Sequence, residues 1–157
     1  AEYKEVLEGY NSGFTHTAQL YNAMPGFHKK GEYKYEGTVE SVYLIDGMTT
    51  EVIADGKHLP STILRLVYKI KGVERIALVT AALAYADYDG EVNPDDNVYI
   101  ENGVCKVKGI NHLAGSIATM DTLVQNMVLK VGTTLRDAVR MASETPAKIM
   151  GIYDQVG

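Results

Sequence analysis

The chain has 157 residues, of which 46% are hydrophobic, and a formal net charge of −5. This composition can bury a sizeable core, so we expect one globular domain over residues 1–157 rather than a disordered chain. The chain is acidic and its Lys and Arg residues are scattered, which argues against nucleic acid as a partner. It also lacks a long apolar stretch, which argues against a membrane as a partner.

The first half of the chain alternates helical and extended patterns. Residues 3–10 predict a short helix that ends before Gly13, and residues 14–20 predict the strand that follows it. The basic and Gly-rich residues 25–37 indicate an exposed loop. Apolar spacing then predicts a helix over 38–45, a buried strand over 51–54, a helix that begins near Pro60 and ends at Gly72, and a buried strand over 75–80.

The second half begins with an irregular acidic region over residues 84–96. Asn102-Gly103 between two alternating runs then predicts a two-residue β-hairpin. Ser116 is expected to cap a helix whose apolar positions repeat from Met120 to Val131. The last two predicted elements are a helix over 135–143 with Thr134 and Asp137 at its start, and a helical turn over 145–150.

Strands that alternate with helices favour parallel βαβ units and therefore an α/β fold. The pattern leaves two architectures open, a doubly wound sheet and part of a (β/α)8 TIM barrel. No Gly-rich phosphate fingerprint follows a strand, which argues against dinucleotide binding. A whole barrel needs about 250 residues, so this chain would supply only part of one.

Cys105 is the only cysteine, which excludes an internal disulfide and a zinc site built from several cysteines. A lone thiol fits a reducing compartment and is expected to be buried and inert. The polar residues 1–5 do not resemble a signal peptide, so the cytoplasm is the expected location.

Three polar clusters follow predicted strands, at residues 16–22, 55–58 and 80–82. In a barrel, catalytic groups collect at the carboxyl ends of strands, so these clusters are candidates for one site. Asp55 is also explained as a carboxylate that satisfies turn amides at a strand end. His112 follows Asn111 and is interpreted as an ordinary loop residue.

Five segments carry recognisable motifs in a consistent order. They are Gly13–Pro25 (GFTHTAQLYNAMP), Ile53–His58 (IADGKH), Ala77–Ala82 (ALVTAA), Leu113–Ser116 (LAGS) and Ala138–Ala147 (AVRMASETPA). Together they resemble the N-acetylglucosamine-6-phosphate deacetylases, a family of metal-dependent amidohydrolases, over essentially the whole chain. The resemblance implies a partial (β/α)8 TIM barrel of the amidohydrolase type, whose small β domain and upstream strands lie outside residues 1–157.

The resemblance also implies an activity and the residues that carry it. The implied reaction hydrolyses the acetamide of N-acetylglucosamine 6-phosphate or a similar phosphosugar, with a divalent metal, zinc or iron, as cofactor. Asn22 and Ala23 would contact the phosphosugar, and Leu113 would lie near it. His58 would bind the substrate and polarise its acetyl carbonyl. Lys30 takes the place of a basic residue that reaches a substrate phosphate across a dimer interface, which implies a homo-oligomer.

Two positions depart from the family pattern. Gln19 stands at the position of a metal-ligand histidine, and Ala81 at that of the aspartate that acts as general acid/base. Glutamine is a poor zinc ligand, and a methyl group transfers no proton. Loss of a general acid/base typically costs about 10²- to 10⁴-fold in rate, and the resemblance places the remaining ligands on strands before residue 1. We therefore expect impaired hydrolysis and weak or absent metal binding.

Three hypotheses remain open at this point. The first is a deacetylase-family polypeptide with impaired catalysis. The second is a non-catalytic half-barrel, which either assembles as an oligomer through open sheet edges or binds a sugar phosphate at Asn22, His58 and the turn at 113–116. The third is an unrelated α/β enzyme that uses His58 or His112 with a carboxylate such as Asp55.

Overall fold

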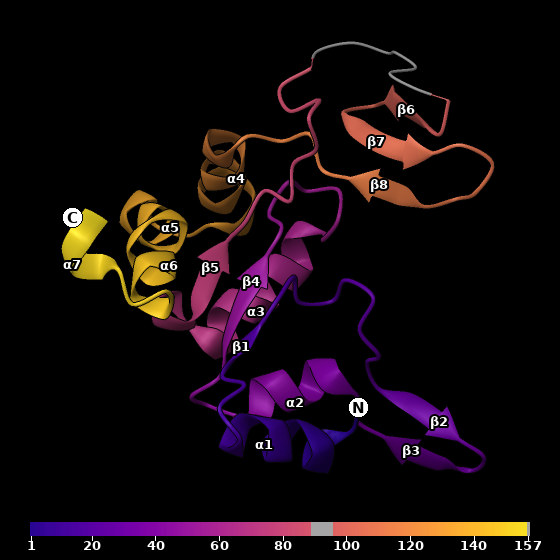
Figure 1. The fold of residues 1–157 in the computed structure, drawn as a ribbon, viewed down its shortest axis with the longest axis vertical. Coiled ribbons are helices and arrows are strands. Elements are labelled where there is room, and N and C mark those ends of the chain that lie inside the picture. The colour runs from indigo at the N-terminus through magenta and orange to yellow at the C-terminus, as the bar shows by residue number, and fades with distance from the viewer. Residues whose placement is uncertain (89–95, 157) are drawn as a thin grey trace.

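A parallel three-stranded sheet lies at the centre of the molecule (Figure 1). The computed structural model describes residues 1–88 and 96–156. The strands follow the order β1-β4-β5, with β1 at His16–Thr17, β4 at Thr49–Val52 and β5 at Ile76–Leu78. His16 pairs with Thr49, and Thr50 with Ile76. Parallel strands joined through helices confirm the predicted α/β fold.

The helices surround this sheet. α1 (Tyr3–Asn11) packs against α2 (Thr38–Leu44), and α5 (Leu135–Ala142) and α6 (Glu144–Ile149) both pack against β5 (Figure 1). The other helices are α3 (Ser61–Lys71), the 3₁₀ turn η1 (Val73–Arg75), α4 (Met120–Asn126), the π-helix η2 (Met127–Val131) and α7 (Tyr153–Val156). Within the described ranges, every helix is too short or too polar to cross a bilayer.

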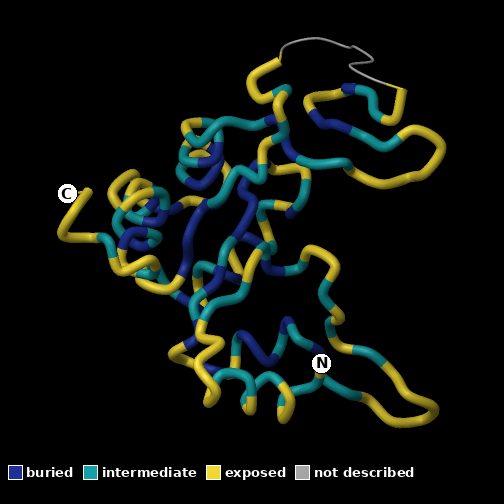
Figure 2. The backbone as a smooth tube through the Cα atoms, viewed as in Figure 1, coloured by how far each residue is buried: buried dark blue, intermediate teal, exposed yellow. Residues whose placement is uncertain are grey.

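The main core lies between the sheet and these helices, as the dark blue segments of Figure 2 show. All three residues of β5 are buried, as predicted for a strand covered on both faces. The buried Lys71 donates hydrogen bonds from Nζ to the carbonyls of Val42 and Ile45, both at 3.0 Å, at the end of α2. Other core residues are Val39, Val52, Leu64, Val67, Ile76, Leu78, Leu123, Met127, Val131, Ala138 and Met141.

A second, antiparallel sheet stands apart from the first (Figure 1). It contains β6 (Val98–Glu101), β7 (Val104–Val107) and β8 (Leu113–Gly115) in this order. The predicted turn at Asn102-Gly103 joins β6 to β7, and both residues have positive φ, 53° and 72°. This sheet has its own small core of Ile100, Cys105 and Ile117, with Leu83, Tyr85, Val98 and Ala114 packed against it.

The structure corrects several predicted elements. Residues 25–37 are not a plain loop, because β2 (His28–Lys30) and β3 (Tyr33–Tyr35) form an antiparallel hairpin that projects from the body (Figure 1). Leu113–Gly115 is a strand rather than a turn. Part of the predicted irregular region 84–96, residues 89–95, lies outside the described residues.

The helix expected from Ser116 onward also differs from the prediction. Ser116 is fully buried, and its Oγ accepts a hydrogen bond from the backbone N–H of Ala118 at 3.0 Å, so the helix begins later, with Thr119 as its N-cap. The predicted apolar run is divided into α4 and η2. Its end at Gly132 is confirmed, as is the hydrogen bond from the backbone N–H of Asp137 to Thr134 Oγ1, at 3.0 Å.

Candidate functional site

A pocket of about 480 Å³ lies at the carboxyl ends of the parallel strands. Its lining combines residues from the loops after β1, β4 and β5 with the turn and strand at 111–115. These residues are Gln19, Asn22, Ile53, His58, Ala81, Asn111, His112, Leu113, Ala114 and Gly115. A second cavity of about 70 Å³ shares Gln19, Asn22, Ile53 and His58 with it. The structure therefore brings residues of all three polar clusters together.

The loop after β1 has an unusual backbone. Gln19, Tyr21 and Ala23 have φ of 43°, 75° and 53°. Such left-handed conformations cost about 1–3 kcal/mol each and persist only where the surroundings impose them. Glu51 of β4 supplies part of that constraint, because its Oε2 accepts from Gln19 N at 3.3 Å and its carbonyl accepts from Leu20 N at 2.9 Å. The position of Gln19 is thus fixed by β4.

Gln19 and Asn22 form a pair of amides at this side of the pocket. Asn22 Nδ2 donates to Gln19 Oε1 at 2.6 Å. Within the described part of the chain, the remaining amide atoms, Gln19 Nε2 and Asn22 Oδ1, make no hydrogen bond. The pair therefore presents one donor group and one acceptor group to a ligand.

His58 lies on the loop after β4, where it is held by Asp55. Asp55 Oδ1 accepts the backbone N–H groups of Lys57 and His58 at 2.8 and 2.9 Å, and Oδ2 lies 2.7 Å from His58 Nδ1. Burial raises the pKa of Asp55, but the hydrogen bonds from His58 and Lys57 outweigh this effect and hold the pKa below its ordinary value. The predicted turn role of Asp55 is confirmed, and the same carboxylate also orients the His58 ring.

A buried amide fixes the end of β4 from the other side. Asn126 of α4 is 4% exposed, and its Nδ2 donates to the carbonyl of Ala54 at 3.0 Å. Because Ala54 directly precedes Asp55, this hydrogen bond helps to place the Asp55–His58 pair at the pocket.

Ala81 and the antiparallel sheet form the opposite wall. Ala81 has a φ of 46°, and the next residue, Ala82, forms a parallel bridge with Ser116. Leu83 N also donates to the Ser116 carbonyl at 2.9 Å. A Cβ at Gly115 would lie 2.9 Å from Leu83 Cγ, so a larger residue there would force the Leu83 side chain to shift. The antiparallel sheet is therefore joined to the segment that follows β5.

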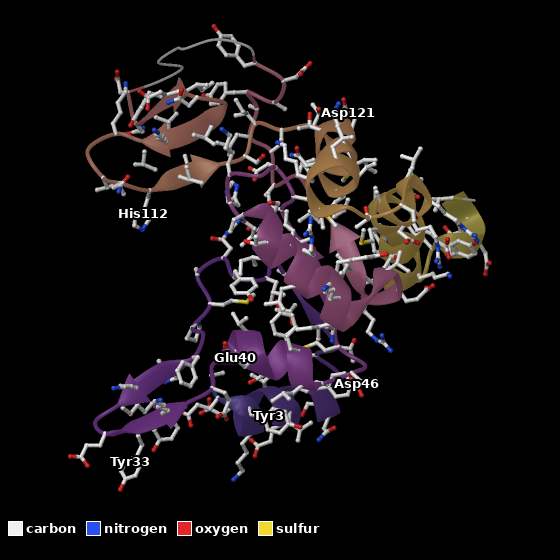
Figure 3. All side chains as sticks on the ribbon, turned by 180° about the vertical axis from the view of Figure 1, so that it is seen from behind. Tyr3, Tyr33, Glu40, Asp46, His112 and Asp121 are labelled. Atoms are coloured by element: carbon white, nitrogen blue, oxygen red, sulfur yellow. The ribbon has the colours of Figure 1, made fainter. Side chains whose placement is uncertain are left out.

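Two further lining residues are Asn111, which sequence reasoning did not propose, and His112, which it considered only for an unrelated enzyme. His112 lies in the connection between β7 and β8 (Figure 3), where its Nδ1 is 2.8 Å from the Asn111 carbonyl. Its interpretation as an ordinary loop residue overlooked this position in the wall. Their place directly before the motif at 113–116 is the signal that could have identified them.

Two of the predicted substrate-binding residues lie outside the pocket. Lys30 of β2 forms an ion pair with Glu2, and its Nζ lies 5.2 Å from the centre of the Tyr35 ring. Ala23 is exposed and does not line the pocket. The contact of Lys30 across an interface stays a prediction, because the structure contains one chain.

The side chains present do not fit a zinc or iron ion. Within residues 1–88 and 96–156, no group of three or more His, Cys, Asp or Glu side chains could hold a metal. Gln19 offers an amide oxygen that already accepts from Asn22. His16 does not line the pocket, since its ring contacts Thr49 Oγ1 at 2.8 Å and Glu51 Oε1 at 3.4 Å.

The structure is thus that of an α/β protein with a polar pocket at the carboxyl ends of its parallel strands, where sites of such folds are generally found. No protein-family model matches the sequence. An N-acetylglucosamine-6-phosphate deacetylase of Lysinibacillus sphaericus is 31% identical over 94% of this chain and 38% of its own length. A putative N-acetylgalactosamine-6-phosphate deacetylase of Escherichia coli (strain K12) is 32% identical over 87% of this chain and 80% of its own length.

Solved structures agree with the sequence comparison. The crystal structure of N-acetylglucosamine-6-phosphate deacetylase from Pasteurella multocida matches with a TM-score of 0.84 and 32% identity, over 100% of this chain and 40% of the other. An aspartate-to-alanine mutant of the Mycobacterium smegmatis enzyme, in complex with N-acetyl-D-glucosamine-6-phosphate, matches with a TM-score of 0.84 and 30% identity over 97% and 40% of the two chains.

The chain belongs to the N-acetylglucosamine-6-phosphate deacetylase family. It spans between 38% and 41% of the length of the first three relatives that it matches.

Proposed function

We propose that residues 1–157 form one domain, part of an amidohydrolase (β/α)8 barrel, whose pocket binds N-acetylglucosamine 6-phosphate or a similar phosphosugar but hydrolyses it poorly. The observation that carries this proposal is the convergence of Gln19, Asn22, His58, Ala81 and Leu113 on one pocket. These are positions that the family motifs identify, and they come from segments far apart in the sequence.

The chemical groups around the pocket support binding more than hydrolysis. No carboxylate is among the described residues that line it, and the methyl group of Ala81 cannot carry the proton of an acid/base. Gln19 and Asn22 offer amide groups, and His58 a ring nitrogen, to the hydroxyl and acetamide groups of a sugar. A divalent metal, zinc or iron, belongs to the resemblance, and we infer weak or absent metal binding because Gln19 replaces a histidine.

One related structure supports this separation of binding from turnover. The mutant from Mycobacterium smegmatis lacks one aspartate, and its structure contains N-acetyl-D-glucosamine-6-phosphate. A family member that has lost an aspartate can therefore hold this ligand, and we propose the same for this chain.

The decisive experiment measures binding and acetate release separately. The unaltered chain is titrated with N-acetylglucosamine 6-phosphate by calorimetry, with zinc or with EDTA, and acetate release is followed in parallel. We expect saturable binding that EDTA does not change, and no acetate above the background. The variant Asn22→Ala should bind more weakly, whereas Asn11→Ala, at the end of α1, serves as its control and should bind normally.

One double variant, compared with the unaltered chain, tests the assignment of the chemical positions. Ala81→Asp with Gln19→His restores both family residues and is assayed with added zinc. Acetate release by this double variant alone would support the assignment, whereas turnover by the unaltered chain would overturn it. Absence of binding by the unaltered chain would contradict the proposed function.

A second candidate function, a non-catalytic half-barrel that assembles as a homo-oligomer, is favoured by one apolar surface. A groove of about 720 Å³ lies between α4, η2 and α5, and Leu129 and Leu135 at its side are 73% and 62% exposed. Sedimentation should then show a mass that rises with concentration, and Leu129→Lys should abolish the rise.

The buried thiol of Cys105 is consistent with the cytoplasm as the location of either form.

A further inference from the structure

Two residues of the loop after β1 tie this loop to the body of the protein. Leu20 is 2% exposed and belongs to the main core, whereas the hydroxyl of Tyr21 lies 2.9 Å from the hydroxyl of Tyr43 on α2, so that one donates to the other. The two rings meet edge to face, with centroids 6.4 Å apart. Gln19 and Asn22 flank these two residues and line the pocket, so their position depends on how the loop is held.

Tyr43 is a firm support because α2 is itself held in place. Val39 and Val42 of this helix are buried in the main core, and Lys71 Nζ donates to the carbonyl of Val42 at 3.0 Å. Burial, and to a smaller degree the hydrogen bond with Tyr21, raise the pKa of Tyr43 above its ordinary value. The Tyr43 hydroxyl therefore keeps its proton and stays available for this hydrogen bond throughout the physiological pH range.

The backbone of the loop needs such a support. Tyr21 has a φ of 75° and lies between Gln19 and Ala23, whose φ values are also positive. An aromatic residue rarely adopts positive φ, and it does so only where its surroundings impose this conformation. If Tyr21 relaxed to negative φ, the backbone between Gln19 and Asn22 would rotate. The 2.6 Å hydrogen bond from Asn22 Nδ2 to Gln19 Oε1 would then be lost.

We propose that Tyr43 is a positioning residue for the pocket: through the hydroxyl of Tyr21 it holds the strained loop in the conformation that presents the amide pair, Gln19 and Asn22, to a ligand. Neither tyrosine is among the described residues that line the pocket of about 480 Å³, so Tyr43 acts on binding only through the loop. The choice of N-acetylglucosamine 6-phosphate as the ligand rests on the proposed function, whereas the control of the loop by Tyr43 does not.

Four variants test the proposal with little change in shape. Tyr43→Phe removes one hydroxyl and leaves the ring contact in place, Tyr21→Phe removes the other hydroxyl, and the double variant removes both. Because the same hydrogen bond is lost in all three, their effects on the loop should be equal rather than additive. Tyr68→Phe is the matched control, since the Tyr68 hydroxyl donates to Asp137 Oδ2 at 2.8 Å in a contact between α3 and α5.

The loop is measured first, in the free protein, by amide hydrogen exchange. The amides of Leu20 and Asn22 report on it, because they donate to the carbonyls of Glu51 and Gln19 at 2.9 and 2.8 Å. We expect their exchange to be about fivefold faster or more in the three variants of the pair, and unchanged in Tyr68→Phe. Unchanged exchange in Tyr43→Phe, equal acceleration in Tyr68→Phe, or additive acceleration in the double variant would overturn the proposal.

The affinity for N-acetylglucosamine 6-phosphate is measured next, by calorimetry. We expect the three variants of the pair to bind about fivefold more weakly or worse, because the amide groups lose their fixed position, whereas Tyr68→Phe should bind normally. Faster exchange with unchanged affinity would overturn the role of Tyr43 at the pocket. If exchange becomes faster as expected but the unaltered chain binds no sugar, the hold of Tyr43 on the loop stands and the proposed function fails.

Discussion

The two walls of the pocket come from regions with very different cores. Gln19 and His58 belong to the parallel-sheet region, where two strands and several helices share one large buried cluster. Asn111 and His112 belong to the antiparallel sheet, whose buried cluster contains Ile100, Cys105 and Ile117. Because stability follows the buried apolar area, we expect the first wall to be rigid and the second to open more readily. The lining residues that follow β1 and β4 are thus expected to be held more firmly than those at 111–115.

The largest expected effect comes from a cavity in the parallel-sheet region. Leu123 of α4 has no exposed surface, and Leu123→Ala should lower the free energy of unfolding by about 2–5 kcal/mol. Urea titration measures the loss. Leu129→Ala, at an exposed position of η2, is the control and should change stability by about 0.5 kcal/mol or less. Equal losses in the two variants would contradict the extent of the main core.

A smaller and more local effect is expected in the antiparallel sheet. Ile100 is 2% exposed, and Ile100→Ala should accelerate amide hydrogen exchange in β6, β7 and β8 while the amides of β4 and β5 keep their protection. Ile110→Ala is the control, because Ile110 is 58% exposed in the connection before β8. Faster exchange in both sheets would show that the two regions open together, and the contrast between them would then fail.

The smallest effect is expected where the two regions meet. Ala81 has a φ of 46°, a conformation that glycine adopts without strain, so Ala81→Gly should raise the free energy of unfolding by up to about 1 kcal/mol. Ala86→Gly, at an exposed position without positive φ, should lower it, since only the unfolded chain gains freedom there. Thermal unfolding of both variants gives the comparison, and equal signs would argue against strain at Ala81.

The sequence predicted those parts of the fold that local chemistry determines. Asn102-Gly103 predicted the hairpin because both residues tolerate positive φ. The meeting of Gln19, His58 and Ala81 was predictable because the carboxyl ends of parallel strands lie at the same edge of a sheet.

Other features depended on contacts that no local pattern encodes. The hairpin β2–β3 was missed because each strand has only three residues, too few for a periodic pattern, and none of them is fully buried. Ser116 was misassigned as a cap because its burial follows from the bridge to Ala82. His112 was interpreted as an ordinary loop residue, and its place at the pocket was not predicted because β8, the strand that follows it, was not predicted.

The buried lysine of α3 has a consequence for the dipole of a different helix. The carbonyl end of a helix carries a partial negative charge of about half an elementary charge. At the end of α2, the carbonyls of Val42 and Ile45 receive the ammonium group of Lys71, so this charge is compensated inside the protein rather than by water. With 2% of its surface exposed, Lys71 is closed to amine-directed reagents in the folded state. Its acylation would therefore report when α2 and α3 separate.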